Sequence, residues 1–331
     1  MKKQDNSKIV LIEGMSPRGH TQFNKYYIKS LSPYINKVYV GESLFNSYKN
    51  LAKVSFFDDK HLFKYRLVIS ISFLINTLKI IYKSKKNGTK YIILLSYDVS
   101  SLFIVVYFSK LFNMKLFVFE HNTVPTKGMH KKILQFICFD WVHRICYTPR
   151  AVEIYKSLNQ KSKYIPLPIP IKEDFENKLN KSLTLNNKEF DFVVFCPSSS
   201  ASMNKVIEKA ELYKNILFII KTKIIINLDN VVTKQYFENY EDIIESVDFF
   251  YLPVSLDSRV SGPFFEAIGA GKKVILSKGY FYDYAKKEFK QYILCDEDDW
   301  NFSTSKMVEM DIDKYNTDII NNIKKYILDE N

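Results

Sequence analysis

Short apolar runs alternate with segments of helical length along this chain, and this alternation most constrains its fold. Residues 91–95 and 115–120 are two such runs, and each is followed by a polar loop and then by a helical segment. Parallel strands need long crossover connections, which helices usually supply, so the pattern predicts a parallel sheet covered by helices. We therefore predict an α/β protein whose functional loops lie at the carboxyl ends of its strands.

The alternation is interrupted once, by three prolines within residues 164–170 and a polar run at 172–188. Residues before proline avoid the helical region, so this stretch is predicted to be extended. We place the domain boundary here, with one Rossmann-like domain at 1–165, a second at 170–310 and a C-terminal helix within 311–331. The predicted strands are 8–12, 37–40, 91–95, 115–120, 144–147, 190–196, 216–220, 224–227, 248–252 and 273–276.

Charge divides unevenly between the two halves. Residues 1–170 contain 27 Lys and Arg against 9 Asp and Glu, a net charge of +18, whereas residues 171–331 contain 21 against 27, a net charge of −6. A basic half of this kind predicts an anionic partner, for which phospholipid headgroups, a lipid diphosphate and nucleic acid are the candidates. The N-terminus has no long apolar segment of the signal-peptide type, and the apolar stretch 102–119 is interrupted by lysines, so no membrane span is predicted.

The segment 251–276 combines a strand, a polar loop and a helix in the order of a phosphate-binding site. A helix N-terminus presents free N–H groups and a partial positive charge, and here it follows a Gly-Pro step at Gly262. Arg259 adds a cation, Ser261 permits a close approach, and Glu266 lies one turn into the helix, where its carboxylate can bind ribose hydroxyls. The residues alone leave open an ordinary capped helix with Glu266 in solvent.

This segment resembles the nucleotide-sugar signature of GT-B glycosyltransferases, above all the family-4-type group. In that signature a strand ends in Pro-Ser, and two Glu residues separated by seven positions are followed by Ala, Gly and a buried strand. The positions here that agree are Pro253, Ser255, Pro263, Glu266, Ala267, Gly271 and 274–276. The resemblance implies two Rossmann-like domains facing each other across a cleft, the first for the acceptor and the second for the nucleotide-sugar.

Two parts of the signature differ in this chain. Ser258 stands where the first Glu of the pair is expected, and Asp257 beside it can substitute if the loop is shifted by one residue. Because that Glu is thought to contact the donor sugar in relatives, the sugar and the retaining or inverting stereochemistry stay open. The Arg expected on the donor diphosphate is missing, Lys205 falls near the expected Lys, and Lys221 is a reserve candidate. Either lysine is equally well explained as a surface residue.

Residues after the first predicted strand resemble the catalytic-base region of inverting GT-B enzymes. His20 begins the first helix, and an imidazole can remove a proton from an acceptor hydroxyl near neutral pH. Arg18 and Gly19 are expected to contact the acceptor, together with Asp98 at the end of another strand. A contact of His20 with the substrate and a structural role for it stay open.

His121 follows a further strand, at a place where GT-B relatives often carry a histidine that approaches the donor sugar. Glu120 beside it is expected to act as a base or to orient the imidazole ring.

The resemblance implies a glycosyltransferase that acts on a saccharide acceptor, which the basic first half suggests is lipid-linked. We expect a cytoplasmic enzyme at the inner face of the cell membrane, in surface polysaccharide synthesis. No Asp-x-Asp motif is present, so we expect no metal, and no cofactor besides the donor substrate. The alternatives are a sugar-nucleotide epimerase of the same fold, a non-catalytic sugar-nucleotide-binding protein and a nucleic-acid binder, although no nucleic-acid-binding motif is recognisable.

Overall fold

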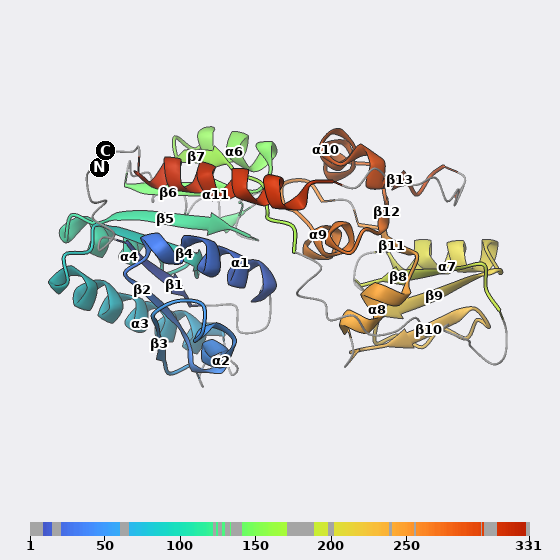
Figure 1. Ribbon diagram of the computed structural model, residues 1–331, viewed down its shortest axis with the longest axis horizontal. Coiled ribbons are helices and arrows are strands. Elements are labelled where there is room, and N and C mark those ends of the chain that lie inside the picture. Colours follow the sequence, from blue (N-terminus) through green and yellow to red (C-terminus); the bar gives the residue numbers. More distant parts are fainter. Residues whose placement is uncertain are drawn as a thin grey trace. The chain divides into compact units, whose positions relative to one another are not determined.

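The computed structural model divides into two compact units. Unit 1 comprises Met1–Pro168 and Asn316–Asn331, and unit 2 comprises Ile169–Tyr315 (Figure 1). The residues that the structure describes are 9–14, 21–59, 66–121, 124, 128–129, 133, 141–170, 189–197, 202–237, 240–254, 256–298, 300 and 310–328.

Unit 1 is built on a seven-stranded parallel sheet with the strand order β3-β2-β1-β4-β5-β6-β7. Its strands are β1 (Ile9–Glu13), β2 (Lys37–Gly41), β3 (Val54–Phe57), β4 (Tyr91–Ser96), β5 (Lys115–Glu120), β6 (Val142–Cys146) and β7 (Lys161–Tyr164). Its helices are α1 (Thr21–Leu31), η2 (Ser32–Tyr34), η3 (Glu42–Leu44), α2 (Phe45–Tyr48), α3 (Arg66–Lys86), α4 (Leu102–Leu111), α6 (Pro149–Lys156) and most of α11 (Ile312–Leu328). None of the helices in the described part of the chain is long and apolar enough to span a bilayer.

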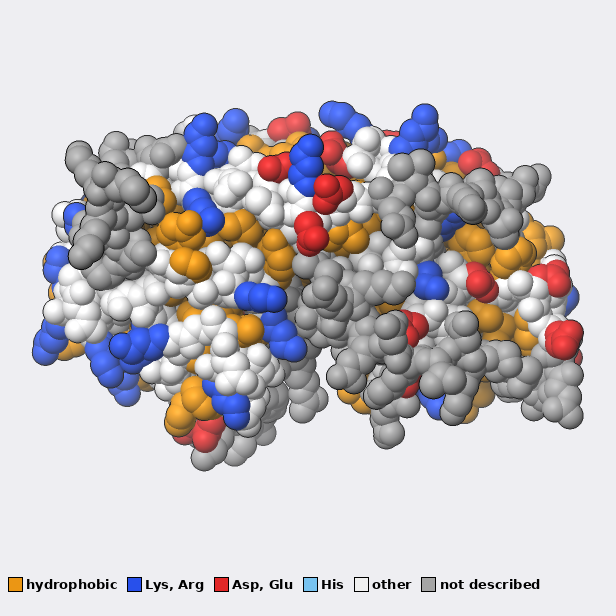
Figure 2. Space-filling view, viewed as in Figure 1, with side chains coloured by type: hydrophobic (Ala, Val, Ile, Leu, Met, Phe, Trp, Pro, Cys, Tyr) orange, Lys and Arg blue, Asp and Glu red, His pale blue; other side chains and the backbone are white. Residues whose placement is uncertain are grey.

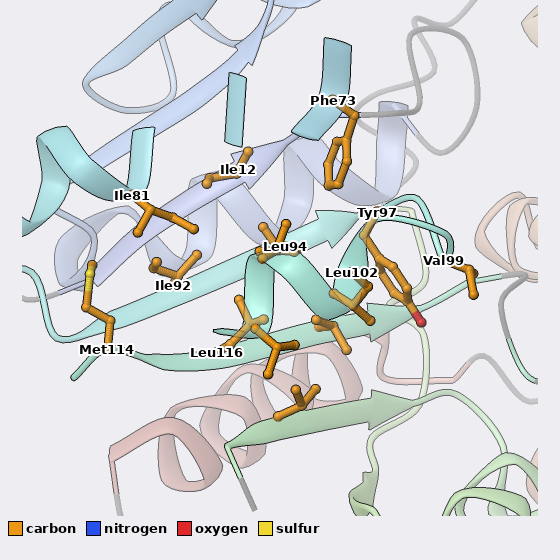
Figure 3. Packing of buried hydrophobic residues seen from close by; sticks show 14 of the residues in the cluster. Ile12, Phe73, Ile81, Ile92, Leu94, Tyr97, Val99, Leu102, Met114 and Leu116 are labelled. Atoms are coloured by element: carbon orange, nitrogen blue, oxygen red, sulfur yellow. The ribbon is translucent and has the colours of Figure 1, made fainter. Parts of the chain in front are cut away.

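The core of unit 1 explains why its central strands consist of nearly continuous apolar runs. Ile12, Ile92 and Leu116 of three neighbouring strands pack with Phe73 of α3 and Leu102 of α4 (Figure 3). A parallel strand covered on both faces by helices has no polar face, so apolar residues fill consecutive positions. This core holds the carboxyl ends of β1, β4 and β5 in fixed positions.

The C-terminal helix α11 packs on the sheet of unit 1. The ring of Tyr326 lies edge-on to Phe117 of β5 with the centroids 5.7 Å apart, and 5.9 Å from the ring of His143 of β6. Lys324 lies over the ring of Tyr34 at 4.3 Å from its centroid. These contacts make the last helix a part of the first unit.

Unit 2 is built on a six-stranded parallel sheet with the strand order β10-β9-β8-β11-β12-β13. Its strands are β8 (Phe192–Cys196), β9 (Ile216–Lys221), β10 (Val231–Lys234), β11 (Phe249–Leu252), β12 (Lys273–Leu276) and β13 (Ile293–Cys295). Its helices are α7 (Met203–Leu212), α8 (Tyr240–Ser246), α9 (Gly262–Gly269), α10 (Tyr280–Glu288) and η6 (Lys290–Tyr292). Two parallel sheets with helices confirm the α/β prediction.

One predicted strand is wrong. Residues 224–227 do not form a strand, and the chain instead forms β10 at Val231–Lys234. A strand starting at 224 would leave only two residues after β9, too few for the crossover that a parallel pair requires. The chain uses 222–230 for this connection, and the buried Asn230 side chain fixes its end by donating to the carbonyl oxygens of Ala210, Tyr213 and Ile216.

In both units the strand order reverses direction at the first strand. β1 lies between β2 and β4, and β8 lies between β9 and β11. Ligands of open α/β sheets bind outside the carboxyl ends of the strands at this kind of switch point. We therefore expect ligand-binding residues in the loops after β1 and β4 in unit 1, and after β8 and β11 in unit 2.

Candidate functional site

The first turn of α9 has no side-chain cap from the residue that precedes it. Ser261 precedes the helix with an extended backbone (φ −100°, ψ 120°), and its side chain makes no capping hydrogen bond to any described residue. Pro263 occupies the first turn, where its missing N–H is not needed. The other N–H groups of this turn lack a cap from Ser261, so they can donate to a phosphate.

The helix that presents these groups is firmly anchored. Phe264 is completely buried, and its ring packs edge-on against Phe281 and Phe289 with centroids 5.1 and 5.5 Å away. Gly271 ends the helix with a φ of 69°, and the Lys272 N–H donates to the carbonyl of Ala267. This Schellman-type ending requires the left-handed conformation that glycine adopts without strain.

Three side chains from different elements meet near this helix start. Tyr240, the first residue of α8, donates a hydrogen bond of 2.8 Å to Oε2 of Glu266 in α9. Lys221, the last residue of β9, has its Nζ 6.0 Å from the centre of the Tyr240 ring. Burial raises the pKa of the Glu266 carboxyl, while the Tyr240 hydrogen bond and the Lys221 charge lower it. Glu266 is thus partly buried and bonded rather than free in solvent.

Lys205 belongs to a second cluster at the same edge of the sheet. It lies in the first turn of α7, and its Nζ is 3.3 Å from Oδ2 of Asp296 and 3.4 Å from Oγ of Ser277. Ser277 donates a 2.5 Å hydrogen bond to the same carboxylate oxygen. The lysine side chain is 48% exposed while the aspartate is 3% exposed, so a buried anion holds a cation that still reaches solvent.

The remaining predicted donor residues lie in the loop between β11 and α9 or at the start of α9, and they differ in exposure. Ser258 is buried, whereas Asp257 and Arg259 on either side of it are exposed. Gly262 begins α9 and is half-buried. The structure therefore places a small buried hydroxyl, rather than a carboxylate, where the resemblance expects the first Glu.

In unit 1, Glu120 lies at the centre of a buried charge cluster. Its carboxylate accepts hydrogen bonds from Tyr97 at 2.7 and 2.8 Å and from Tyr155 at 2.8 Å, and forms an ion pair of 2.5 Å with Arg144. Neither ion-pair side chain reaches solvent, and Arg144 also donates to Gln160. A carboxylate bonded on both oxygens in this way favours a structural role over that of a base.

His121 follows Glu120 directly, lies just beyond the end of β5 and is half-buried. Its Nε2 lies 3.4 Å from the Tyr147 hydroxyl, and the two ring centroids are 5.1 Å apart. Burial raises the pKa of Tyr147, so its hydroxyl stays protonated. The tyrosine can orient the imidazole, and the ring remains accessible.

The predicted acceptor residues are only partly described. Asp98 accepts hydrogen bonds of 2.9 Å from both the N–H and the hydroxyl of Ser101, and so organises the entry into α4. Arg18, Gly19 and His20 lie outside the described residues.

Glu13 is a site candidate that sequence reasoning missed. It ends β1 at the switch point and is buried, and its carboxylate accepts hydrogen bonds from Ser96 at the end of β4 (2.5 Å) and from Asn24 of α1 (2.7 Å). A carboxylate that ends an apolar strand just before a glycine is the signal that could have found it. Within the described part of the chain, His, Cys, Asp and Glu side chains form no metal-binding group of three or more.

Comparisons with known proteins identify the fold of this chain. No protein-family model and no curated protein matches the sequence. A glycosyltransferase from Rickettsia africae has a similar structure, with a TM-score of 0.67 and 12% identity over 99% of this chain and 100% of that one. The Anabaena protein HepE in complex with UDP has a TM-score of 0.63 and 12% identity over 96% of this chain and 90% of that one.

A UDP-N-acetylglucosamine 2-epimerase is similar as well. The protein from Rickettsia bellii has a TM-score of 0.58 and 13% identity over 97% of this chain and 96% of that one. Transferases and epimerases thus share one architecture, and at this identity the likeness establishes the fold alone. The chain has the GT-B fold of two Rossmann-like α/β units that its sequence resemblance predicts.

Proposed function

We propose that this protein is a glycosyltransferase whose unit 2 binds a nucleotide-diphosphate-sugar. The observation that supports this most is the meeting of Lys221, Tyr240 and Glu266 beside the N-terminus of α9. A helix start that binds an anion, with a positioned carboxylate one turn later, fits a nucleotide. The diphosphate oxygens accept hydrogen bonds from N–H groups, and the ribose hydroxyls donate to the carboxylate. HepE, which has the same fold, was solved in complex with UDP and with UDP-glucose.

Most of the predicted donor residues contact the nucleotide-sugar in this proposal. The α9 N–H groups, Arg259 and Lys205 balance the diphosphate charge without a metal ion, and Glu266 accepts hydrogen bonds from the ribose hydroxyls. Ser258 or Asp257 faces the donor sugar. No cofactor is required, because the nucleotide-sugar itself is the substrate.

The acceptor is proposed to bind unit 1, near Arg18, Gly19 and Asp98. His20 removes the proton from the acceptor hydroxyl, and His121 approaches the transferred sugar, a hexose or a related one. The basic first half of the chain supports a lipid-linked saccharide at the inner face of the cell membrane, in the synthesis of a surface polysaccharide.

The second candidate is a sugar-nucleotide epimerase, favoured by the likeness to UDP-N-acetylglucosamine 2-epimerases. Such an enzyme interconverts its nucleotide-sugar without an acceptor. A non-catalytic protein would bind the nucleotide-sugar and leave it unchanged.

A panel of nucleotide-sugars tests these functions. The true donor, at about 100 times its Kd, should stabilise the folded protein by about 2.7 kcal/mol. Incubating that donor with and without lipid-linked saccharide then separates transfer, epimerisation and simple binding by their products. Stabilisation by none of the nucleotide-sugars would overturn the donor site, and loss of turnover in EDTA would overturn metal independence.

A further inference from the structure

The amino-terminal edge of the unit 1 sheet contains a basic pocket, at the opposite end of the strands from the candidate site residues of unit 1. The pocket measures about 430 Å³ and lies where α3 turns into β4 and α4 turns into β5. The residues that line it are Lys85, Gly88, Thr89, Lys90, Tyr91, Asn113 and Lys115.

The lining of this pocket suits a phosphate group. Three lysines surround it, and two of them, Lys85 and Lys90, are exposed and form no ion pair with a described residue. Thr89 is 2% exposed, and its hydroxyl oxygen has no hydrogen-bond partner among the residues that the structure describes. Gly88 has a φ of 74° with open space where a Cβ would lie. Ammonium groups and a buried hydroxyl donor are the partners that phosphate oxygens accept from.

The surroundings of the pocket are basic as well. Lys37 begins β2, and its pKa is lowered by burial and by the positive charges of Lys83 and Lys53. Carboxylates of unit 1 such as Glu13 and Glu120 instead end strands at the opposite edge. Like charges crowded at one edge repel one another, and a bound anion relieves this repulsion.

An exposed apolar face adjoins the basic edge. Six large apolar side chains on two neighbouring helices are between 44% and 74% exposed. They are Ile71, Ile75 and Tyr82 on α3, and Phe103, Tyr107 and Leu111 on α4. Their spacing of four or seven residues puts each trio on one face of its helix. Soluble monomers rarely expose apolar side chains in such groups unless the surface binds something.

Lysines lie among these apolar side chains. Lys79, Lys83 and Lys86 on α3 and Lys110 on α4 are exposed, and Lys86 Nζ lies 4.7 Å from the centre of the Tyr82 ring. Figure 2 shows Lys and Arg side chains gathered over the end of unit 1 that carries α3 in Figure 1. A helix face that mixes aliphatic, aromatic and lysine side chains is typical of binding to anionic lipid surfaces.

We propose that this α3–α4 face binds an anionic phospholipid bilayer, and that the pocket of Lys85, Lys90 and Lys115 takes up a headgroup phosphate. Nucleic acid would use the lysines and the aromatic rings, but it offers no apolar environment to Ile71, Ile75 and Leu111. This assignment rests on the proposed function, and it adds to that function the surface that contacts the membrane.

Vesicle flotation tests the assignment with the full chain. We expect it to bind vesicles of phosphatidylcholine and phosphatidylglycerol in a two-to-one mixture, and to bind pure phosphatidylcholine vesicles far less. Lys85→Gln with Lys90→Gln should lower the affinity for the anionic vesicles about tenfold, because each lysine near the surface contributes to the attraction. The matched control, Lys214→Gln with Lys223→Gln, removes the same charge from exposed positions of unit 2 and should change little.

A second variant tests the apolar face. Tyr107→Ser with Leu111→Ser should weaken binding at both low and high salt, whereas the effect of the lysine pair should shrink at high salt because the charges are screened. Equal binding of the lysine variant and its control, equal binding to neutral and anionic vesicles, or tighter binding to an oligonucleotide would each overturn the proposal.

Failure here can be told apart from failure of the proposed function. The lysine and serine variants should keep the wild-type stabilisation by the nucleotide-sugar donor, which is measured without lipid. If no nucleotide-sugar stabilises the protein but the vesicles bind as expected, the membrane face stands and the transferase assignment falls.

Discussion

Tyr240 donates a 2.8 Å hydrogen bond to Glu266, and this single contact joins the start of α8 to the first turns of α9. Lys221, at the end of β9, has its Nζ 6.0 Å from the centre of the tyrosine ring. The carboxylate is therefore oriented before any ligand arrives, and a ligand need not supply the free energy of ordering it.

Glu266→Ala should weaken UDP binding by about 10- to 100-fold, since hydrogen bonds to a charged group contribute about 1.5–3 kcal/mol. Isothermal titration with UDP measures the loss. Tyr240→Phe is the matched control. It keeps the carboxylate but removes the hydrogen bond that orients it, and it should weaken UDP binding by less than tenfold. Unchanged UDP affinity in Glu266→Ala would show that the nucleotide binds elsewhere.

The raised pKa of Glu266 predicts how its charge affects the stability of unit 2. The folded state binds the proton on Glu266 more tightly than the unfolded state does. The stabilisation of the fold by this protonation is therefore complete below the ordinary carboxyl pKa, and it is lost as the pH rises through the folded-state pKa. Glu266→Gln, which can still accept from Tyr240, should therefore make the ligand-free protein more stable at neutral pH.

The unfolding of unit 2 can be followed by the fluorescence of Trp300, with Trp141→Phe as the background. The stability difference between Glu266→Gln and wild type should shrink toward acid pH, where both side chains are neutral. A constant difference across this range would contradict the burial argument.

The ends of single elements could be predicted well from the sequence, but their partners could not. β5, β12 and α8 begin and end at or next to the predicted residues because a strong apolar pattern and polar flanks define them. β3 and β7 were missed because VSFF and KSKY are short and only partly buried, so sheet pairing rather than pattern forms them.

The same limit applies to the site. Glu266 could be identified from a local motif, since the loop, the helix start and the carboxylate are consecutive. Tyr240, Asp296 and Glu13 could not, because their importance depends on which strand ends lie side by side. Asp296 follows β13 and Lys205 follows β8, 91 residues apart in the chain, and only the strand order brings them together.

Lys205→Ala should weaken UDP binding by about tenfold and lower the free energy of unfolding by about 1 kcal/mol, since the ion pair with Asp296 is half-exposed. Asp296→Asn is the informative comparison, because it keeps a polar partner for Ser277 and leaves the lysine in place. It should retain most of the UDP affinity. An equal loss in both variants would mean that the carboxylate, not the lysine charge, organises the donor site.

Glu120→Gln should lower the free energy of unfolding by about 3–5 kcal/mol, because it leaves the buried Arg144 cation without its counter-charge. Urea denaturation measures the change. Glu120→Gln with Arg144→Met removes both charges and should recover part of the loss. If Glu120→Gln is as stable as wild type but inactive, Glu120 is the base that the sequence suggested.

His121→Asn should lower turnover by about 100-fold or more while changing donor affinity little, if the imidazole transfers a proton or polarises the sugar during the reaction. The ring is half-buried, and the Tyr147 hydroxyl lies 3.4 Å from its Nε2, so the surroundings orient it without closing it off. Tyr147→Phe removes the hydroxyl that orients the ring, together with its hydrogen bond to Tyr27, and should reduce turnover by less than His121→Asn does. The pH profile of turnover separates a chemical role from a structural one. An imidazole that transfers a proton gives the profile a limb that is absent in His121→Asn, whereas loss of a structural histidine lowers the height of the profile and leaves its shape unchanged.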